Sequence, residues 1–206
     1  MTITNGYTTQ ALVAAELGIT SPSASDQTKI DAAVNAASRQ IDGHCGRRFW
    51  QDGSLTAREF YADDSWRVVG DDISTTTGLV VKIDSGADGT WADTLTISTD
   101  FILEPLNAAD RAPVWPYEAI RAVNNYTLPM LSNGRPGVQV TAKFGWPDVP
   151  DDIASACQIQ AVQLYKASQA VFGGLSFDGA ILRVREGLNP LAAALCEQYV
   201  RRDLPR

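Results

Sequence analysis

Polar and apolar side chains follow two different periods along this chain. Between residues 150 and 171 the apolar positions recur every three or four residues, which is typical of one face of a helix. Pro150 suits the first helical position, and Asp151 and Asp152 follow where the helix macrodipole favours negative charge. Gln160 falls inside the apolar stripe and needs a hydrogen-bond partner if it is buried. The pattern predicts a central core helix, ended by Gly173-Gly174, with the apolar positions Ile153, Ala156, Cys157, Ala161, Leu164, Ala167 and Val171.

The same period predicts three further helices. A short helix opens at Thr8-Thr9-Gln10 and ends at Gly18, and a last helix opens at Asn189-Pro190, a cap followed by a first-turn proline. Because alanine lets two helices approach closely, we expect the second helix to pack on the core helix. That second helix runs from about residue 26 to 42, and its stripe consists of Ile30, Ala33, Val34, Ala37 and Ile41.

The stretch from residue 55 to 144 has no helical period and contains short β-prone runs separated by turn residues. The last run shows the clearest alternation of apolar and polar residues, which is typical of a half-buried strand. We therefore predict an antiparallel sheet or a small barrel. The runs are residues 57–61, 66–69, 79–83, 94–97, 101–103, 120–123 and 138–144.

Together these elements predict an α+β fold, in which a small helical bundle carries an antiparallel β-sheet or small barrel inserted between the second helix and the long core helix. Within the C-terminal arm we expect residues 175–179 to form an exposed loop and residues 181–185 to be extended. The predicted segments are the N-terminal helices of the bundle (1–50), the β-rich insertion (51–145), the core helix (146–174), and the C-terminal arm with the last helix (175–206).

The composition is that of a soluble globular chain, with 45% hydrophobic and 20% charged residues, no transmembrane run and no signal peptide. Cys45, Cys157 and Cys196 are widely spaced and form no CxxC motif, which indicates reduced thiols in a cytosolic setting. Residues 51–152 carry sixteen acids and seven bases, within a net charge of −7 for the whole chain. An acidic middle disfavours tight binding to nucleic acid, but taken alone it is better explained as a solvated acidic face.

We find no motif that predicts catalysis, a metal or a cofactor. Asp84-x-Gly86-x-Asp88-Gly89 lacks the third and twelfth ligands of a calcium loop, so a hairpin turn is expected there. His44 is the only histidine and falls at a predicted helix end, which favours a surface or capping role. Nucleophile-elbow, phosphate-loop and dinucleotide-binding motifs do not occur. We therefore expect a protein that is not an enzyme and that holds neither cofactor nor metal.

The residues alone leave two other functions open. A β-rich carbohydrate- or peptide-binding module of a virion or cell surface would need exposed Trp91 or Trp115. A small acid-dependent hydrolase would use aspartate pairs that include Asp63 or Asp71. In strand connections such pairs are more often turn formers.

Four separated stretches resemble the head-to-tail connector (adaptor) proteins of tailed bacteriophages. Residues 32–49, which end in Gly-Arg-Arg-Phe, are similar to the family's second helix and the turn that closes it. Residues 140–153 resemble the family's last strand and the Val-Pro-Asp/Glu-Asp-Ile start of its long helix. The other matches are Leu164-Tyr165-Lys166 with Phe172-Gly173-Gly174, and residues 189–202, which resemble the closing helix of actinobacteriophage members. The middle of the chain resembles the family only in its general pattern of short β-prone runs and turn residues.

The resemblance implies a structural virion protein of the neck, assembled in the host cytoplasm as a ring of twelve copies under the portal protein. An isolated copy can be monomeric. The implied partners are the portal protein and a downstream connector, stopper or tail protein, while DNA passes through the ring without specific binding and no membrane is involved. The family's C-terminal segment docks into the portal, so our candidate portal contacts are Arg183, Arg185, Arg201 and Arg202, with ordinary surface arginines as the alternative.

Overall fold

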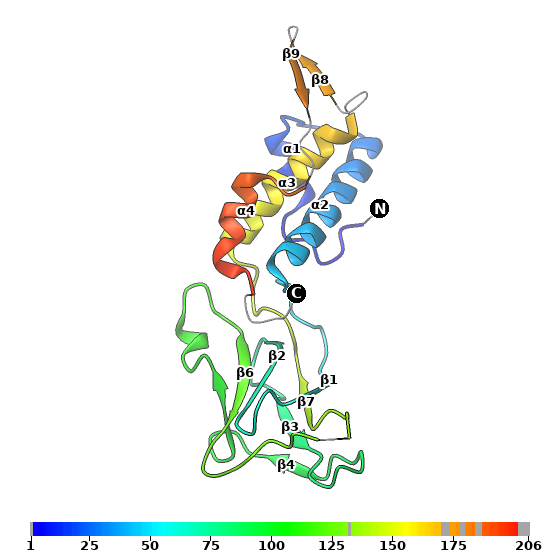
Figure 1. Cartoon of the computed structure of the whole chain (residues 1–206). Coiled ribbons are helices and arrows are strands. Elements are labelled where there is room, and N and C mark those ends of the chain that lie inside the picture. The colour runs from blue at the N-terminus through cyan, green and yellow to red at the C-terminus, as the bar shows by residue number, and fades with distance from the viewer. Residues whose placement is uncertain (1, 132, 170–173, 178–179, 184–186, 202–206) are drawn as a thin grey trace. The chain divides into compact units, whose positions relative to one another are not determined.

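The computed structural model describes residues 2–131, 133–169, 174–177, 180–183 and 187–201. The chain divides into two compact units. Residues Met1–Phe49 and Val149–Arg206 form the helical unit, and Trp50–Asp148 form the β unit (Figure 1). The predicted α+β fold, with antiparallel strands inserted between the second helix and the core helix, is confirmed.

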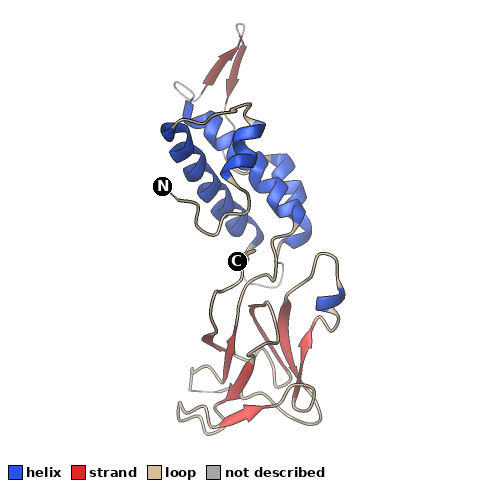
Figure 2. Cartoon of the chain, turned by 180° about the vertical axis from the view of Figure 1, so that it is seen from behind, coloured by secondary structure: helices blue, strands red, loops and turns tan. Residues whose placement is uncertain are grey.

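The helical unit is built on two long helices, α2 (Ala24–Cys45) and α3 (Asp151–Gln169), which lie side by side in Figures 1 and 2. Small side chains form their contact, since Ala33, Ala37, Ala156 and Ala161 are all buried. The predicted close packing of the alanine-rich helix on the core helix is therefore confirmed. The shorter elements of this unit are α1 (Gln10–Glu16), α4 (Pro190–Cys196) and the 3₁₀ turn η2 (Glu197–Tyr199).

Helix α2 extends beyond the predicted range of 26–42 at both ends. At its start Ser23 is the N-cap, and its hydroxyl accepts the Asp26 N–H at 3.2 Å while the Asp26 carboxylate accepts the Ser23 N–H at 3.1 Å. This reciprocal capping box makes Asp26 the third helical residue, not the first. At its end the helix continues through Gly43 and stops at Gly46, which has the left-handed φ of 66° that suits glycine.

The described residues of the β unit form two antiparallel sheets around one apolar core. The four-stranded sheet has the order β1-β7-β3-β4, and the three-stranded sheet has the order β2-β6-β5. An isolated bridge between Ile73 and Phe144 links the two sheets. The strands are β1 (Thr56–Phe60), β2 (Arg67–Ile73), β3 (Val80–Ile83), β4 (Asp93–Leu95), β5 (Phe101–Glu104), β6 (Tyr117–Ala122) and β7 (Val138–Ala142).

Strand β7 is one of the two inner strands of the larger sheet, paired with β1 and β3. Val138, Val140 and Ala142 are buried while the residues between them are half-buried, so the predicted alternation is confirmed. Its partner β1 lies antiparallel to it, with Thr56 opposite Ala142. Gly145 follows with φ 102°, and a Cβ placed there would lie 1.9 Å from the carbonyl oxygen of Trp50, so only glycine fits.

Between α3 and α4 the chain forms a hairpin of β8 (Gly174–Phe177) and β9 (Ala180–Arg183), with Leu175 opposite Leu182. The prediction of a loop at 175–179 is wrong for residues 175–177, which are a strand, and the extended segment predicted next is β9. Residues 178–179 and 184–186, together with the predicted helix stop at Gly173, lie outside the described residues. No helix in the described ranges is both long and apolar enough to cross a membrane.

Candidate functional site

Gln160 sits in the middle of α3, fully buried, and connects three parts of the helical unit. Its side-chain amide donates to Gln40 Oε1 of α2 at 2.7 Å and to the carbonyl of Gly187 at 3.3 Å. Its Oε1 accepts the backbone N–H of Asn189 at 2.8 Å. The hydrogen-bond partner that the sequence requires for a buried Gln160 is therefore present. These bonds fix the segment that returns from the β8–β9 hairpin against the core helix.

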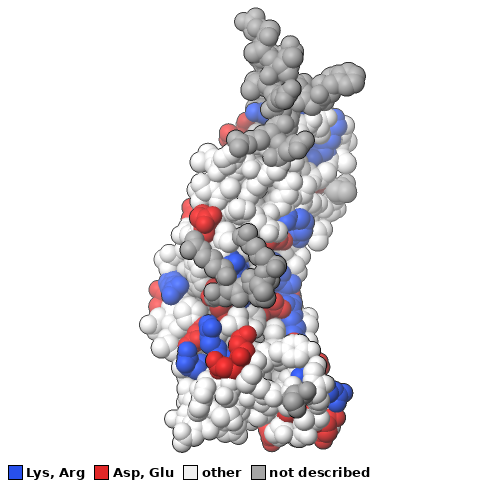
Figure 3. All heavy atoms as spheres, viewed as in Figure 1, with Lys and Arg blue, Asp and Glu red and all other residues white. Residues whose placement is uncertain are grey.

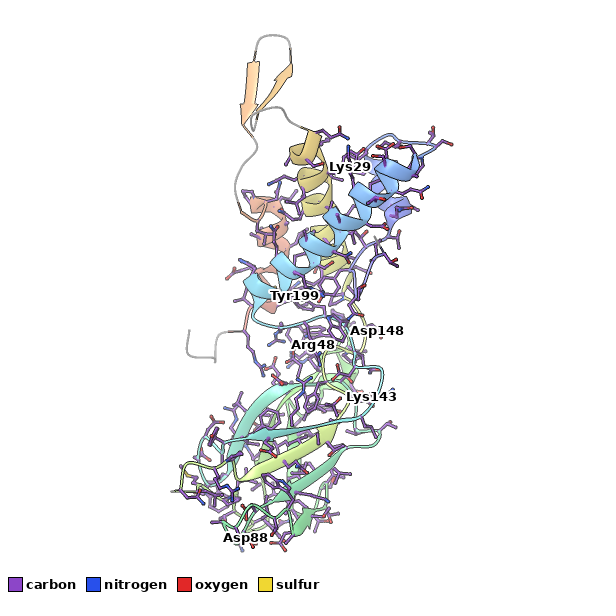
Figure 4. All side chains as sticks on the ribbon, turned by 90° about the vertical axis from the view of Figure 1, so that its right-hand side faces the viewer. Lys29, Arg48, Asp88, Lys143, Asp148 and Tyr199 are labelled. Carbon is purple, nitrogen blue, oxygen red and sulfur yellow. The ribbon has the colours of Figure 1, made fainter. Side chains whose placement is uncertain are left out.

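The C-terminal helix is held by a second set of polar contacts. Asn189 caps α4 by accepting the Leu191 N–H at 2.9 Å, and its amide donates to Gln163 at 2.8 Å. At the other end of α4, the Asp152 carboxylate accepts hydrogen bonds from Gln198 at 2.7 Å and from the hydroxyl of Tyr199 at 3.2 Å (Figure 4). Burial, with Asp152 nearby, raises the pKa of Tyr199 to about 12. The segment after the hairpin is thus an integral part of the bundle.

The structure describes two of the four candidate portal contacts, Arg183 and Arg201. Arg201 is half-buried, and its backbone N–H donates to the carbonyl of Cys45 at 2.8 Å. Arg183 is the last residue of β9, where its backbone pairs with Gly174. Arg185 and Arg202 lie outside the described residues. A portal-binding role for these arginines stays a prediction.

The N-terminal segment is tied to α2 through Tyr7. The Tyr7 hydroxyl donates to the carboxylate of Asp42 and accepts the Phe49 N–H at 2.9 Å, while the Tyr7 N–H donates to Ser38 Oγ at 3.2 Å. Arg39 forms an ion pair with the same carboxylate at 2.9 Å. Burial raises the pKa of both Tyr7 and Asp42 above their usual values. This cluster joins the two ends of residues 7–49 and has the character of a structural anchor.

Of the aspartates that could supply acid or base chemistry, Asp63 and Asp64 form a turn, whereas Asp71 lies in β2 and forms an ion pair with Arg58. Asp63 accepts the N–H of Val69 and Asp64 accepts the N–H of Trp66, both at 2.6 Å. In the former calcium-loop candidate, the two carboxylate oxygens of Asp84 accept the N–H groups of Asp88 at 3.2 Å and Gly89 at 2.8 Å. Figure 4 shows Asp88 in this turn. Both carboxylate oxygens of Asp84 are thus used within the turn, as the sequence predicts for a hairpin.

The other candidate metal ligands and nucleophiles of the described residues do not cluster in one place. Among the described residues no three His, Cys, Asp or Glu side chains gather closely enough to hold a metal ion. His44 is exposed in the last turn of α2, and the three cysteines are buried free thiols. A cavity in the β unit, lined by Phe60, Val68 and Phe144 among others, measures about 10 Å³, which is room for one water molecule.

The tryptophans differ from the arrangement that the carbohydrate-binding alternative needs. Trp91 and Trp115 are half-buried, and Trp115 stacks edge-to-face on the fully buried Trp146 at 4.7 Å between ring centroids. The exposed tryptophan is Trp66, at 45%. Trp146 also donates from Nε1 to Asp72 at 3.2 Å. The pairing of Trp115 with Trp146 therefore serves packing within the β unit.

The two units differ sharply in charge. The β unit carries fourteen acidic and seven basic side chains, a net charge of −7, whereas the helical unit carries ten of each. Glu104 accepts from Arg67 at 3.0 Å and from Arg121 at 2.6 Å; partial burial opposes its ionisation, but the two guanidinium groups outweigh it and lower the pKa of Glu104. Acidic and basic side chains are interspersed on the face seen in Figure 3. The surplus of acid belongs to the β unit alone.

Comparison with known proteins identifies the fold but no sequence family. No protein-family model and no curated protein match the chain. It shares its fold with a chain from the neck of an empty gene transfer agent particle. That neck was computed with C6 symmetry, and the alignment covers 99% of this chain and 95% of the other, with a TM-score of 0.56 and 19% sequence identity. A chain from the virion of the native gene transfer agent particle aligns over the same shares with the same TM-score and identity.

Two features of the C-terminal segment show what sequence reasoning found and missed. Gln160 was identified because a polar residue interrupts an apolar stripe, although its partners Gln40 and Asn189 were not. The strand β8 was missed, yet its signal is present, since Leu175 and Phe177 flank Ser176 with the alternation of a strand. The signal spans only four residues, and short runs of this kind are ambiguous without knowledge of the pairing partner.

Proposed function

We propose that this chain is a structural protein of the neck of a phage-like particle, a head-to-tail connector (adaptor) that forms a ring under the portal protein. The observation that carries this proposal is the shared fold with a gene transfer agent neck chain over 99% of the chain, at a TM-score of 0.56. The sequence motifs at both helical ends support the proposal separately, because they resemble those of head-to-tail connector proteins. Such a protein resides in the virion neck and needs no catalytic site.

In this proposal the ring continues the DNA channel from the portal to the next neck or tail protein. Each copy brings a β unit with a net charge of −7, and a lumen that carries negative charge repels phosphate and lets DNA pass without binding. The proposed stoichiometry is twelve copies.

The proposed contact with the portal lies in the C-terminal segment, through the hairpin and Arg183, Arg185, Arg201 and Arg202. The hairpin is well suited to this role because its return segment is anchored to α3 by Gln160, so docking does not require the bundle to open. A two-stranded hairpin is marginally stable alone in water and gains stability from a partner.

The test is electron microscopy of particles produced with and without this chain. We expect particles that lack it to have a portal with no ring beneath it and no attached tail. The variant Arg183→Glu with Arg185→Glu should lose the ring, while Lys29→Glu, an exposed charge reversal near the start of α2 (Figure 4), should keep it. A neck that is unchanged when the chain is deleted would refute the proposed function.

A further inference from the structure

The loop between β5 and β6, residues 105–116, is a braced structure outside the two sheets, where Figure 2 shows it carrying a short helix. That helix is η1 (Ala108–Asp110), and Ala108 is fully buried. The N–H of Trp115 donates to the carbonyl of Ala108 at 3.0 Å and closes the loop. The loop therefore holds one conformation through its own contacts.

The indole of Trp115 supports this conformation from three sides. Its ring packs on Trp146 at 4.7 Å, its Nε1 donates to Glu118 at 3.0 Å, and the guanidinium of Arg111 lies 5.6 Å above the ring. Trp146 in turn is fully buried in the β unit. Because the loop is already ordered in the free chain, it loses little conformational entropy when a partner binds, and this favours binding.

The braced loop presents apolar side chains to solvent. Leu106 is 67% exposed and Val114 is 38% exposed, and Ala112 and Pro113 between them are also exposed. The burial of Ala108 shows that the loop has an inward side, so the outward position of Leu106 is not a consequence of disorder. An apolar loop whose conformation is fixed before binding is suited to contact a partner.

The charge of the loop indicates the kind of partner that it contacts. Residues 105–116 contain one acid and one base and are neutral, within a β unit of net charge −7. Two of the other large exposed apolar side chains of this unit, Tyr61 and Trp66, flank the acids Asp63 and Asp64. Copies of one acidic unit repel each other, and a contact through a neutral segment such as this loop lowers that electrostatic cost.

We propose that the 105–116 loop is a contact between copies of this chain, in which Leu106 and Val114 of one copy dock on the adjacent copy of the ring. This inference rests on the proposed function. In a ring each copy uses one surface toward its left neighbour and a different one toward its right, so the loop is one half of a head-to-tail contact.

The test places a photoreactive benzoylphenylalanine at position 106 of the full-length chain in assembled particles. After irradiation we expect denatured bands at multiples of the chain mass of 22.2 kDa. The double variant Leu106→Asp with Val114→Asp should enter particles at least about tenfold less than the wild type, because two apolar contacts are lost at each interface. Leu12→Asp, a matched change at a side chain 51% exposed on α1, should enter normally.

A cross-link to the portal or to any other protein, or the absence of a cross-link, would overturn the inference. Normal ring formation by the double variant would overturn it as well. Since all the substituted side chains are exposed, the purified variants should unfold like the wild type, which separates assembly from folding. If the wild-type chain itself is absent from the neck, the proposed function fails; if only the loop variant behaves normally, the proposed function stands.

Discussion

Replacing Gln160 by leucine tests the anchor of the C-terminal segment most directly. Leucine has a similar volume and suits the apolar stripe of α3, so the change removes hydrogen bonds with little change in packing. Three bonds are lost, to Gln40, Gly187 and Asn189, at 2.7, 3.3 and 2.8 Å.

The size of the stability change depends on whether water can replace Gln160 as the hydrogen-bond partner of each group. Gln40 and Gly187 are exposed, so water replaces the bonds to them and each loss costs about 0.5 kcal/mol. The Asn189 N–H is less accessible, and leaving it without an acceptor costs about 1–2 kcal/mol. The extra apolar burial of leucine returns roughly 0.5–1 kcal/mol. We expect a net loss of about 1–2.5 kcal/mol in the free energy of unfolding of the helical unit.

Two measurements check this expectation. Denaturant unfolding followed by helical circular dichroism gives the free energy, and amide hydrogen exchange reads the Asn189 N–H, which should exchange at least about tenfold faster. The control is Gln158→Leu, a half-buried glutamine on the same helix, which should change neither quantity appreciably. If Asn189 keeps wild-type protection in Gln160→Leu, the assigned role of Gln160 is wrong.

Three further predictions concern other anchors. Tyr7→Phe removes the hydroxyl that donates to Asp42 and should lower the unfolding free energy by about 1–3 kcal/mol in chemical denaturation. Gly145→Ala forces a Cβ to within 1.9 Å of the Trp50 carbonyl oxygen, so the β unit should lose more than about 3 kcal/mol, seen as loss of its near-ultraviolet signal. Glu104 has a lowered pKa, so its stabilising contribution is present above the unfolded value of 4.5 and is lost as the pH falls through the folded value; Glu104→Gln should flatten this acid limb by about 0.5–1 kcal/mol in unfolding curves measured from pH 6 to pH 3.

The helices could be predicted from sequence because their signals are local. Pro150 and the apolar spacing after it predicted the start of α3 to within one residue, and Asn189-Pro190 predicted the start of α4. The bounds of α2 were less accurate, because Asp26 is a good residue both at a cap and at the third helical position, and only the hydrogen bonds with Ser23 decide between them. Gly43 and Gly46 are both typical residues of a helix end, so the sequence does not decide between them; the helix passes through Gly43 and ends at Gly46.

The β unit could be predicted as strands but not as sheets. Alternation in 138–142 shows that β7 is half-buried, yet nothing in that run indicates that β7 pairs with both β1 and β3. Such pairings depend on segments more than fifty residues apart in sequence. The bracing of the 105–116 loop was missed for the same reason, since the contact of Trp115 with Trp146 joins two positions that carry no shared local pattern.

The pairing of β1 with β7 also has a consequence for how this chain can change. These are the first and last strands of the insertion, and the backbone N–H of Asp52 donates to the carbonyl of Phe144 at 2.8 Å. The chain therefore enters and leaves the β unit at neighbouring points. An inserted unit whose first and last strands are adjacent can change in size or in charge, or be replaced by another, while the helical unit keeps the packing of α2 on α3. Chains that share this helical unit can therefore differ in the β unit inserted into it.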